Sequence, residues 1–199
     1  MKPSKDNEIQ AITGATISSA AIVRILNTGI KKAKAVLLAD GDITNNQPSM
    51  ENVLSVLPEN VNIKEIEKND QLVYVASKGK DIIAYAIPVA CEGYQSEIML
   101  MVGVNADFSE ILEVKVLSQS ETPGWGSKIV NDPSNENNPC WFIDQFKGLK
   151  IDPEITYVKN VKSTKDTEIQ AISGATISSA AIVRILNTGI KNAKTILGK

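Results

Sequence analysis

Hydrophobic residues recur every three or four positions in two long segments of the chain, and this spacing predicts two amphipathic helices. The first is expected over residues 17–38 and the second over residues 177–197. A shorter helix is expected from Met50 to Leu57, where Pro58 would end it because proline has no backbone N–H to donate. Asp, Asn and Gly are frequent over residues 40–48, which are therefore expected to be a linker.

Runs rich in Val and Ile follow the short helix, and the polar turns between them predict antiparallel strands joined as a meander. A longer stretch, residues 118–139, is rich in Pro, Gly and Asn. We expect it to be a functional loop, since long connections in compact domains usually are. Residues 140–146 are expected to form a short aromatic helix or turn. The strands are expected over residues 72–76, 82–90, 97–104, 111–117 and 155–161. The expected fold class is α+β, with an antiparallel sheet meander packed against helices.

An internal repeat divides the chain. Residues 5–37 return almost unchanged as residues 165–197, with 28 of 33 positions identical. We expect residues 1–39 to be the tail and helix of a preceding repeat, and residues 49–199 to be a single domain. The second copy follows the core directly and is expected to pack on it. The first copy is expected to be an extra N-terminal helix that lies along the domain or docks on a neighbouring chain, which would give helix-mediated self-association.

Composition excludes several classes of function. The net charge is −2 and no basic cluster is dense, so no nucleic-acid partner is expected. The chain has no histidine, which excludes a Ser-His-Asp or Cys-His catalytic centre and removes the commonest ligand of zinc and haem. No cluster has metal-ligand spacing, so we expect no metal site. Because histidine is absent, we expect no catalytic side chain either. Any chemistry is expected to belong to a bound cofactor.

The string Ser173-Gly174-Ala175-Thr176 opens the second long helix. Gly174 allows a tight turn, and Thr176 is expected at the start of the helix, where free N–H groups and the macrodipole favour a phosphate. Ser178 and Ser179 add hydroxyl donors nearby. The alternative is an ordinary Ser or Thr cap on an amphipathic helix, and the residues alone leave both interpretations open.

The string Glu121-Thr122-Pro123-Gly124-Trp125-Gly126 lies in the long loop. Pro123-Gly124 suits a type II turn. Trp125, between two glycines, could lie against a planar aromatic ring, or it could be buried in the core; the residues do not decide between these. The Glu121 carboxylate is expected to accept hydrogen bonds from backbone N–H groups rather than act as an acid or base.

Together these strings resemble a known family. Ser173 to Thr176 resembles the S/T-G-A-T motif of the FMN-binding domain family. Glu121 to Ile129 is similar to the E-T-P-G loop found in the G subunit of the Rnf electron-transport complex and in the C subunit of the sodium-translocating NADH:quinone reductase. Gly93-Tyr94 and the aromatic segment from Trp141 to Gly148 resemble two further family segments. The resemblance extends over roughly residues 50–199.

The resemblance implies FMN attached through its phosphate to Thr176 by a dedicated flavin transferase, with Thr16 as the equivalent residue of the first copy. The loop with Trp125 would line the isoalloxazine ring. Gln170 departs from the family, which usually has Asp at this position. The cofactor-binding set so implied is Gly93, Tyr94, Glu121, Thr122, Pro123, Gly124, Trp125, Gly126, Lys128, Ser173, Gly174, Ala175, Thr176 and Thr16.

The resemblance further implies an electron carrier, rather than a substrate-converting enzyme, in a membrane-associated extracytoplasmic electron-transport chain. Redox proteins of that chain would be its partners, and the present chain would itself be soluble. Two alternatives remain open. One is an FMN reductase with non-covalent flavin, and the other is a flavin-free binding or spacer module of a surface repeat protein.

Overall fold

A five-stranded antiparallel sheet forms the centre of the fold. The computed structural model describes residues 48–68 and 71–199, so the helix expected over residues 17–38 and Thr16 lie outside the described residues. The strands follow one another in the order β1-β2-β3-β4-β5, each antiparallel to the next, which confirms the predicted meander and the α+β fold class. They are β1 (Asn62–Lys68), β2 (Gln71–Lys78), β3 (Asp81–Glu92), β4 (Glu97–Asn105) and β5 (Ile111–Ser118).

Strand β1 was not predicted. Its sequence, NIKEIEK, contains two apolar residues among charged ones, and five of its seven residues are exposed. Such a strand lies at the sheet edge, where only one neighbour pairs with it and few side chains are buried. Hydrophobic periodicity therefore carries little signal for it.

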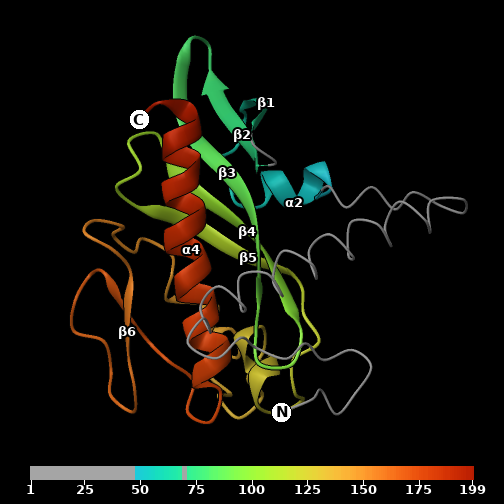
Figure 1. Ribbon diagram of the computed structural model, residues 1–199, viewed down its shortest axis with the longest axis vertical. Helices are drawn as coiled ribbons and strands as arrows, with labels where there is room; N and C mark the ends of the chain where they lie inside the picture. Colours follow the sequence, from blue (N-terminus) through green and yellow to red (C-terminus); the bar gives the residue numbers. More distant parts are fainter. Residues whose placement is uncertain (1–47, 69–70) are drawn as a thin grey trace, which may run out of the picture. The chain divides into compact units, whose positions relative to one another are not determined.

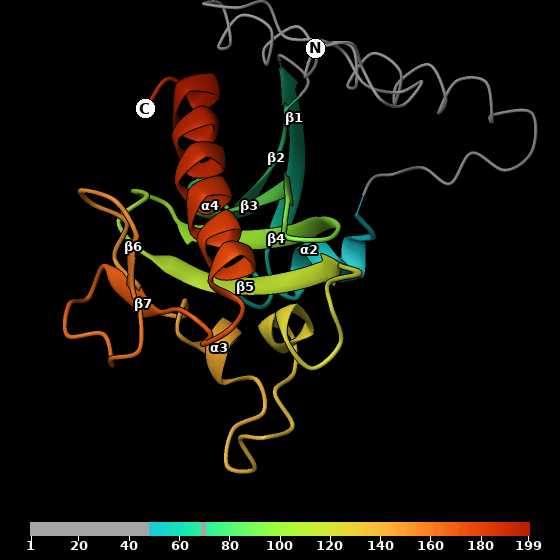
Figure 2. The same cartoon turned by 60° about the horizontal axis from the view of Figure 1, so that its bottom comes forward.

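The two faces of the sheet bury different helices, because successive side chains of a strand point to opposite faces. On one face, Val73 and Val75 join a large core with the C-terminal helix α4 (Thr176–Leu197). On the other face, Tyr74 packs with the residues around the short helix α2 (Met50–Leu54). Figures 1 and 2 show α4 in red along the sheet and α2 in cyan.

Helix α4 is the second copy of the repeat, and it packs on the sheet as predicted. Gly189 lets it approach strand β3 closely, since a Cβ at this position would lie 2.4 Å from Cγ1 of Val89. The Asn187 side chain pairs with the backbone of Ile155, donating to its carbonyl at 2.8 Å and accepting from its N–H at 3.0 Å. Helix α4 is therefore held both by packing and by a specific polar contact.

The strand predicted over residues 155–161 is shorter and lies outside the main sheet. It forms β6 (Thr156–Val158), which pairs in parallel with β7 (Glu168–Gln170). Each strand has only three residues, too few for an alternating pattern to show in the sequence. Strand β7 leads directly into the turn before α4, so this small sheet fixes where α4 begins.

The segment between β5 and the short helix α3 (Trp141–Asp144) is the 119–140 loop, close to the predicted bounds. It contains a single turn of 3₁₀ helix, η1 (Gly126–Ile129). Figure 2 shows this loop, in yellow to orange, at the end of the sheet where α4 begins. The strings Glu121–Gly126 and Ser173–Thr176, which are about fifty residues apart in sequence, are thereby brought together.

Candidate functional site

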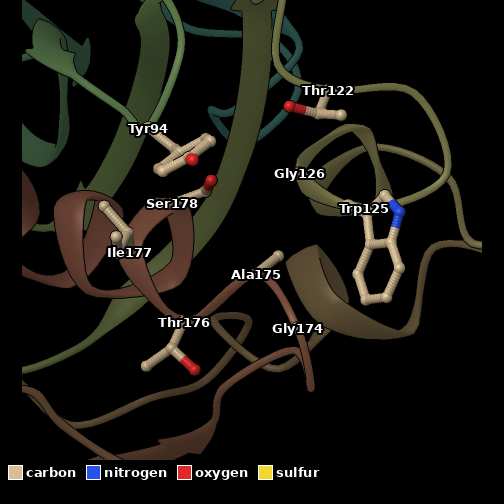
Figure 3. Close-up of a pocket in the computed structure, with 9 residues that line it drawn as sticks. All are labelled: Tyr94, Thr122, Trp125, Gly126, Gly174, Ala175, Thr176, Ile177 and Ser178. Carbon is tan, nitrogen blue, oxygen red and sulfur yellow. The ribbon is translucent and has the colours of Figure 1, made fainter.

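A cleft of about 490 Å³ lies between the 119–140 loop and the first turn of α4. This volume is typical of small-molecule sites, which measure about 300–1,000 Å³. Both predicted strings contribute to it, and Figure 3 shows Trp125 on one side of the start of α4 and Tyr94 on another. The lining residues are Tyr94, Thr122, Trp125, Gly126, Gly174, Ala175, Thr176, Ile177 and Ser178.

Thr176 is the first residue of α4, and the residue that caps the helix is Ala175. Alanine has no side-chain oxygen, so this helix lacks the Ser or Thr cap that the alternative interpretation required. Ser173, which could have supplied a cap, donates instead to the side chain of Asn160 at 3.0 Å. The first-turn N–H groups of a helix have no intrahelical partner, and the macrodipole adds partial positive charge there. The cleft therefore has an anion-favouring end at Thr176.

A buried serine shapes the turn that precedes Thr176. The hydroxyl of Ser179 accepts from the N–H of Ile172 at 3.1 Å and donates to the carbonyl of Ala175 at 3.0 Å. These two bonds tie the chain before the helix to the helix itself. The position of Thr176 is consequently set by the fold rather than by a free loop.

Trp125 is not buried in the core: 58% of it is exposed. Its ring lies against Gly174, where an added Cβ would be 2.3 Å from Cζ3 of the indole. Gly174 also has φ +81°, a backbone conformation that glycine adopts easily and other residues adopt at a cost. The N–H of Trp125 donates to the carbonyl of Thr122 at 3.1 Å, and Gly124 has φ +75°, as the predicted type II turn requires.

Two further large apolar side chains at the cleft are mostly exposed. Tyr94 is 66% exposed and Ile177 is 57% exposed. With Trp125 they give three such residues around one opening, and clustered exposed apolar groups commonly mark a binding site. Ile177 was absent from the predicted set, since one apolar residue in an amphipathic helix carries no signal of its own.

Glu121 lies behind the cleft and is 3% exposed. One carboxylate oxygen accepts from the N–H groups of Gln95 and Ser96, both at 2.9 Å. The other accepts from the N–H of Tyr94 at 3.1 Å and from the hydroxyl of Ser178. The expectation that this carboxylate bonds to backbone N–H groups is confirmed.

Burial alone would raise the pKa of Glu121, but the hydrogen bonds from Ser178 and from the backbone N–H groups outweigh it. The net pKa is lowered, so the group is a carboxylate at neutral pH. Two glycines pack against it: a Cβ at Gly93 would lie 2.6 Å from Oε1, and one at Gly126 would lie 2.8 Å from Oε2. A single charge thus joins the Tyr94 turn, the 119–140 loop and the first turn of α4.

A comparison with protein families agrees with the resemblance that the sequence strings suggested. The family model of FMN-binding domains matches residues 1–31 and 93–191, which is more than half of the chain. The chain belongs to the FMN-binding domain family. The longer match contains every residue that lines the cleft, and the shorter one falls on the first copy of the repeat.

Named relatives agree with this assignment. The chain is 35% identical to the G subunit of the proton-translocating ferredoxin:NAD(+) oxidoreductase complex of Clostridium ljungdahlii, over 63% of this chain and 61% of the relative. It is 30% identical to the Na⁺-translocating counterpart of Acetobacterium woodii over 63% of this chain and 58% of the relative. The chain thus spans about three fifths of the length of these relatives.

In structure, the chain is similar to NqrC of Shewanella oneidensis, with a TM-score of 0.53 and 22% identity over 75% of this chain and 73% of that one, a likeness of fold. It is also similar to the C subunit of the Na⁺-translocating NADH-quinone reductase of Parabacteroides distasonis, with a TM-score of 0.52 and 25% identity over 65% and 63%. Over residues 48–68 and 71–199, no helix has the length and apolarity needed to cross a bilayer.

Several predicted residues of this FMN-binding domain lie outside the cleft lining. Lys128 forms an ion pair with Asp132 at 3.2 Å and donates to Ser134 at 3.3 Å. Pro123, Gly124 and Ser173 shape the two turns, whereas Gly93 and Glu121 stand behind the cleft. The sequence motifs therefore contain residues that line the cleft, but they did not separate these from the residues that support it.

Proposed function

We propose that this domain carries FMN as an electron-transfer group, with the flavin phosphate esterified to the hydroxyl of Thr176. One observation carries the proposal: Thr176 begins a helix that has no side-chain cap, in a cleft that an exposed tryptophan also lines. A phosphate at Thr176 would take up the first-turn N–H groups that nothing else caps. The residues present therefore fit the group.

The apolar residues around the cleft would hold the isoalloxazine ring. Trp125 offers a planar face, and Tyr94 and Ile177 offer apolar area, all three more than half exposed. When bound, FMN supplies the chemistry, accepting and donating one or two electrons. The open position of the cleft would leave the ring within reach of a redox partner, as an electron carrier requires.

The names of the relatives suggest the type of complex in which this domain acts. Several of them are G subunits of ion-translocating oxidoreductase complexes, so we assign this domain to a membrane redox complex of that type. We place it on the extracytoplasmic side, where a flavin transferase would load it and redox proteins of the complex would be its partners. The backbone of Gln170 is bonded to the Gln145 side chain through both its N–H and its carbonyl, which leaves the Gln170 side chain as the part that a transferase could read.

The test is co-expression of the full chain with a flavin transferase. We expect a yellow, fluorescent band that survives denaturing electrophoresis, and an intact mass raised by FMN minus one water. Thr176→Ala should abolish the band, and Thr176→Ser should retain it in part because serine keeps the hydroxyl. Thr16→Ala is the matched control for the first copy of the repeat.

The outcomes separate the alternatives. A band that survives in the double variant Thr16→Ala, Thr176→Ala would mean that flavin is attached elsewhere. Flavin that is bound but released on denaturation would support a reductase with non-covalent FMN. A colourless chain from cells in which the transferase loads a control protein would support the flavin-free module.

A further inference from the structure

Positive charge is concentrated in the last forty residues of the chain. Residues 48–158 contain 17 Asp and Glu against 8 Lys and Arg, whereas residues 159–199 contain two Asp and Glu against seven Lys and Arg. The net charge of −2 hides this separation, and it is the local charge that sets the potential at a surface. Three of the seven lie close together in the connection between β6 and β7, and residues 159–165 are called the basic connection below.

The three lysines of the basic connection are exposed and have no ionic partner. They are Lys159, Lys162 and Lys165. Over residues 48–68 and 71–199, none of them forms an ion pair with a carboxylate. Lys159 lies 6.0 Å from the centre of the Tyr157 ring, a contact that leaves its exposed charge without an anion. These charges therefore hold no described part of the fold together, and they are available to a negatively charged partner.

The basic connection is attached to the turn that opens α4. The hydroxyl of Ser173, in that turn, donates to the Asn160 side chain at 3.0 Å. Asn160 has φ +58°, a conformation that asparagine adopts more readily than most residues. Val161 follows and is 57% exposed. Figure 2 shows the segments around β6 and β7, in orange, beside the start of α4. Lys159 and Lys162 thus flank an exposed apolar residue next to the cleft.

We propose that the cleft opening and the basic connection together form a docking surface for an acidic redox protein. Protein interfaces commonly combine an apolar centre with a polar rim. Here the apolar centre is the group of mostly exposed side chains at the opening, Tyr94, Trp125 and Ile177, and the lysines are the rim. Charges at a rim steer the approach of a partner of opposite sign.

The charges also orient that partner. Glu92 and Glu97, both exposed, lie on either side of the Tyr94 turn, so the positive side of the opening is that of the basic connection. An anionic membrane would attract the same lysines. A redox protein is favoured because the lysines lie beside the cleft, where a partner must come close for an electron to pass. The inference rests on the proposed electron-carrier function, but the docking itself can be measured without flavin.

The experiment measures binding of the full, flavin-free chain to a flavodoxin whose surface is rich in Asp and Glu. Isothermal titration calorimetry gives the dissociation constant, and cytochrome c serves as a basic redox protein for comparison. The test variant is the double charge reversal Lys159→Glu, Lys162→Glu. Its matched control is Lys78→Glu, Lys80→Glu, two exposed lysines at the β2–β3 turn, which lies at the other end of α4 from the cleft (Figure 1).

The unaltered chain should bind flavodoxin at about 20 mM NaCl and much more weakly at about 300 mM, because salt screens exposed charges. It should not bind cytochrome c. The Lys159→Glu, Lys162→Glu variant should weaken binding about tenfold, since reversal removes attraction and adds repulsion. The control variant should weaken it less than about twofold. Both variants should keep the melting midpoint of the unaltered chain, because all four side chains are exposed.

Equal weakening by the two variants would overturn the proposal, since binding would then report total charge and no particular surface. It would also be overturned if the unaltered chain did not bind flavodoxin at low salt. Phosphatidylglycerol vesicles are the third arm. If they, and not flavodoxin, bound the chain through Lys159 and Lys162, the surface would be a membrane contact and the proposal would be wrong.

A second measurement separates this inference from the proposed function. In stopped-flow mixing, reduced flavodoxin gives up one electron and the FMN-loaded chain takes it up. The rate constant at low salt should fall about tenfold in Lys159→Glu, Lys162→Glu, in step with binding. Binding that follows the expected pattern while no electron passes would contradict the electron-carrier function and support the docking surface. Electron transfer at the same rate in both variants would overturn the docking surface and leave the electron-carrier function standing.

Discussion

The 119–140 loop holds two buried carboxylates, and they are used in different ways. Glu121, at its start, accepts from the N–H groups of residues 94–96 and from Ser178 on α4. Asp132, in its middle, accepts from Ser134, from Nε1 of Trp141 at 3.0 Å and from Lys128. The partners of Glu121 belong to other segments of the cleft, whereas those of Asp132 belong to the loop itself and to α3.

The pKa of each group shows that both are ionised in the fold. For Asp132, the hydrogen bond from the Ser134 hydroxyl is the largest cause; burial opposes it, and the bonds from Trp141 and Lys128 add to it, so its pKa falls well below the usual range. For Glu121 burial is the largest cause, and the hydrogen bonds overcome it, so its pKa is lowered too. The Glu121 charge therefore joins the segments around the cleft, and the Asp132 charge joins parts of the 119–140 loop to α3.

The largest effect is expected from Glu121→Ala. It would leave the buried Ser178 hydroxyl and three partly buried backbone N–H groups without their acceptor, and donors left unpaired away from water cost free energy. We expect the free energy of unfolding to fall by about 3 kcal/mol or more, measured by urea denaturation. Flavin incorporation should fall with it, because the Tyr94 turn and the first turn of α4 would no longer share a partner.

Two further variants test whether these losses are specific to Glu121. Glu97→Ala removes an exposed carboxylate from the start of β4 and should change stability by less than about 0.5 kcal/mol. Asp132→Asn should destabilise the loop but leave flavin incorporation near the unaltered level. If Asp132→Asn lowered incorporation as much as Glu121→Ala did, the division of roles between the two carboxylates would be wrong.

A smaller effect is expected from Gly174→Ala, with Gly124→Ala as its control. Both glycines have positive φ, so alanine should cost about 1 kcal/mol at either position. Of the two, only Gly174 has a neighbour that the added Cβ would meet, the ring of Trp125, whereas at Gly124 it has nothing within 4 Å. We expect Gly174→Ala to be the more destabilising by about 1–2 kcal/mol and to alter tryptophan emission. Equal effects of the two variants would show that the ring moves aside without cost.

The sequence predicted the parts of the fold that rest on long periodic segments. Helix α4 and strands β2 to β5 bury regular apolar stripes, and their existence was visible without a structure. Strand β1 and the pair β6–β7 were not, because an exposed edge strand and two strands of three residues bury too little to impose a pattern.

The sequence indicated the two strings that form the candidate site, but it did not indicate how their residues contact one another. A resemblance of motifs pointed to Thr176 and Trp125, and both line the cleft. That Gly174 is the surface on which Trp125 lies could not be foreseen, since the contact joins residues far apart in sequence. That Glu121 bonds to backbone N–H groups was predicted, but which segments supply its partners needed the structure, because they are far from it in sequence.

The smallest expected effect is on the pH dependence of stability. A carboxylate whose pKa is lower in the folded chain than in the unfolded one adds stability above the ordinary carboxyl pKa, and this is lost as pH falls through the folded value. Both Glu121 and Asp132 are of this kind, so the free energy of unfolding should fall as pH decreases below about 5. Glu121→Gln cannot ionise and should give a flatter curve in this range, measured by urea denaturation at a series of pH values. An unchanged slope in Glu121→Gln would mean that the Glu121 carboxylate is not preferentially ionised in the fold.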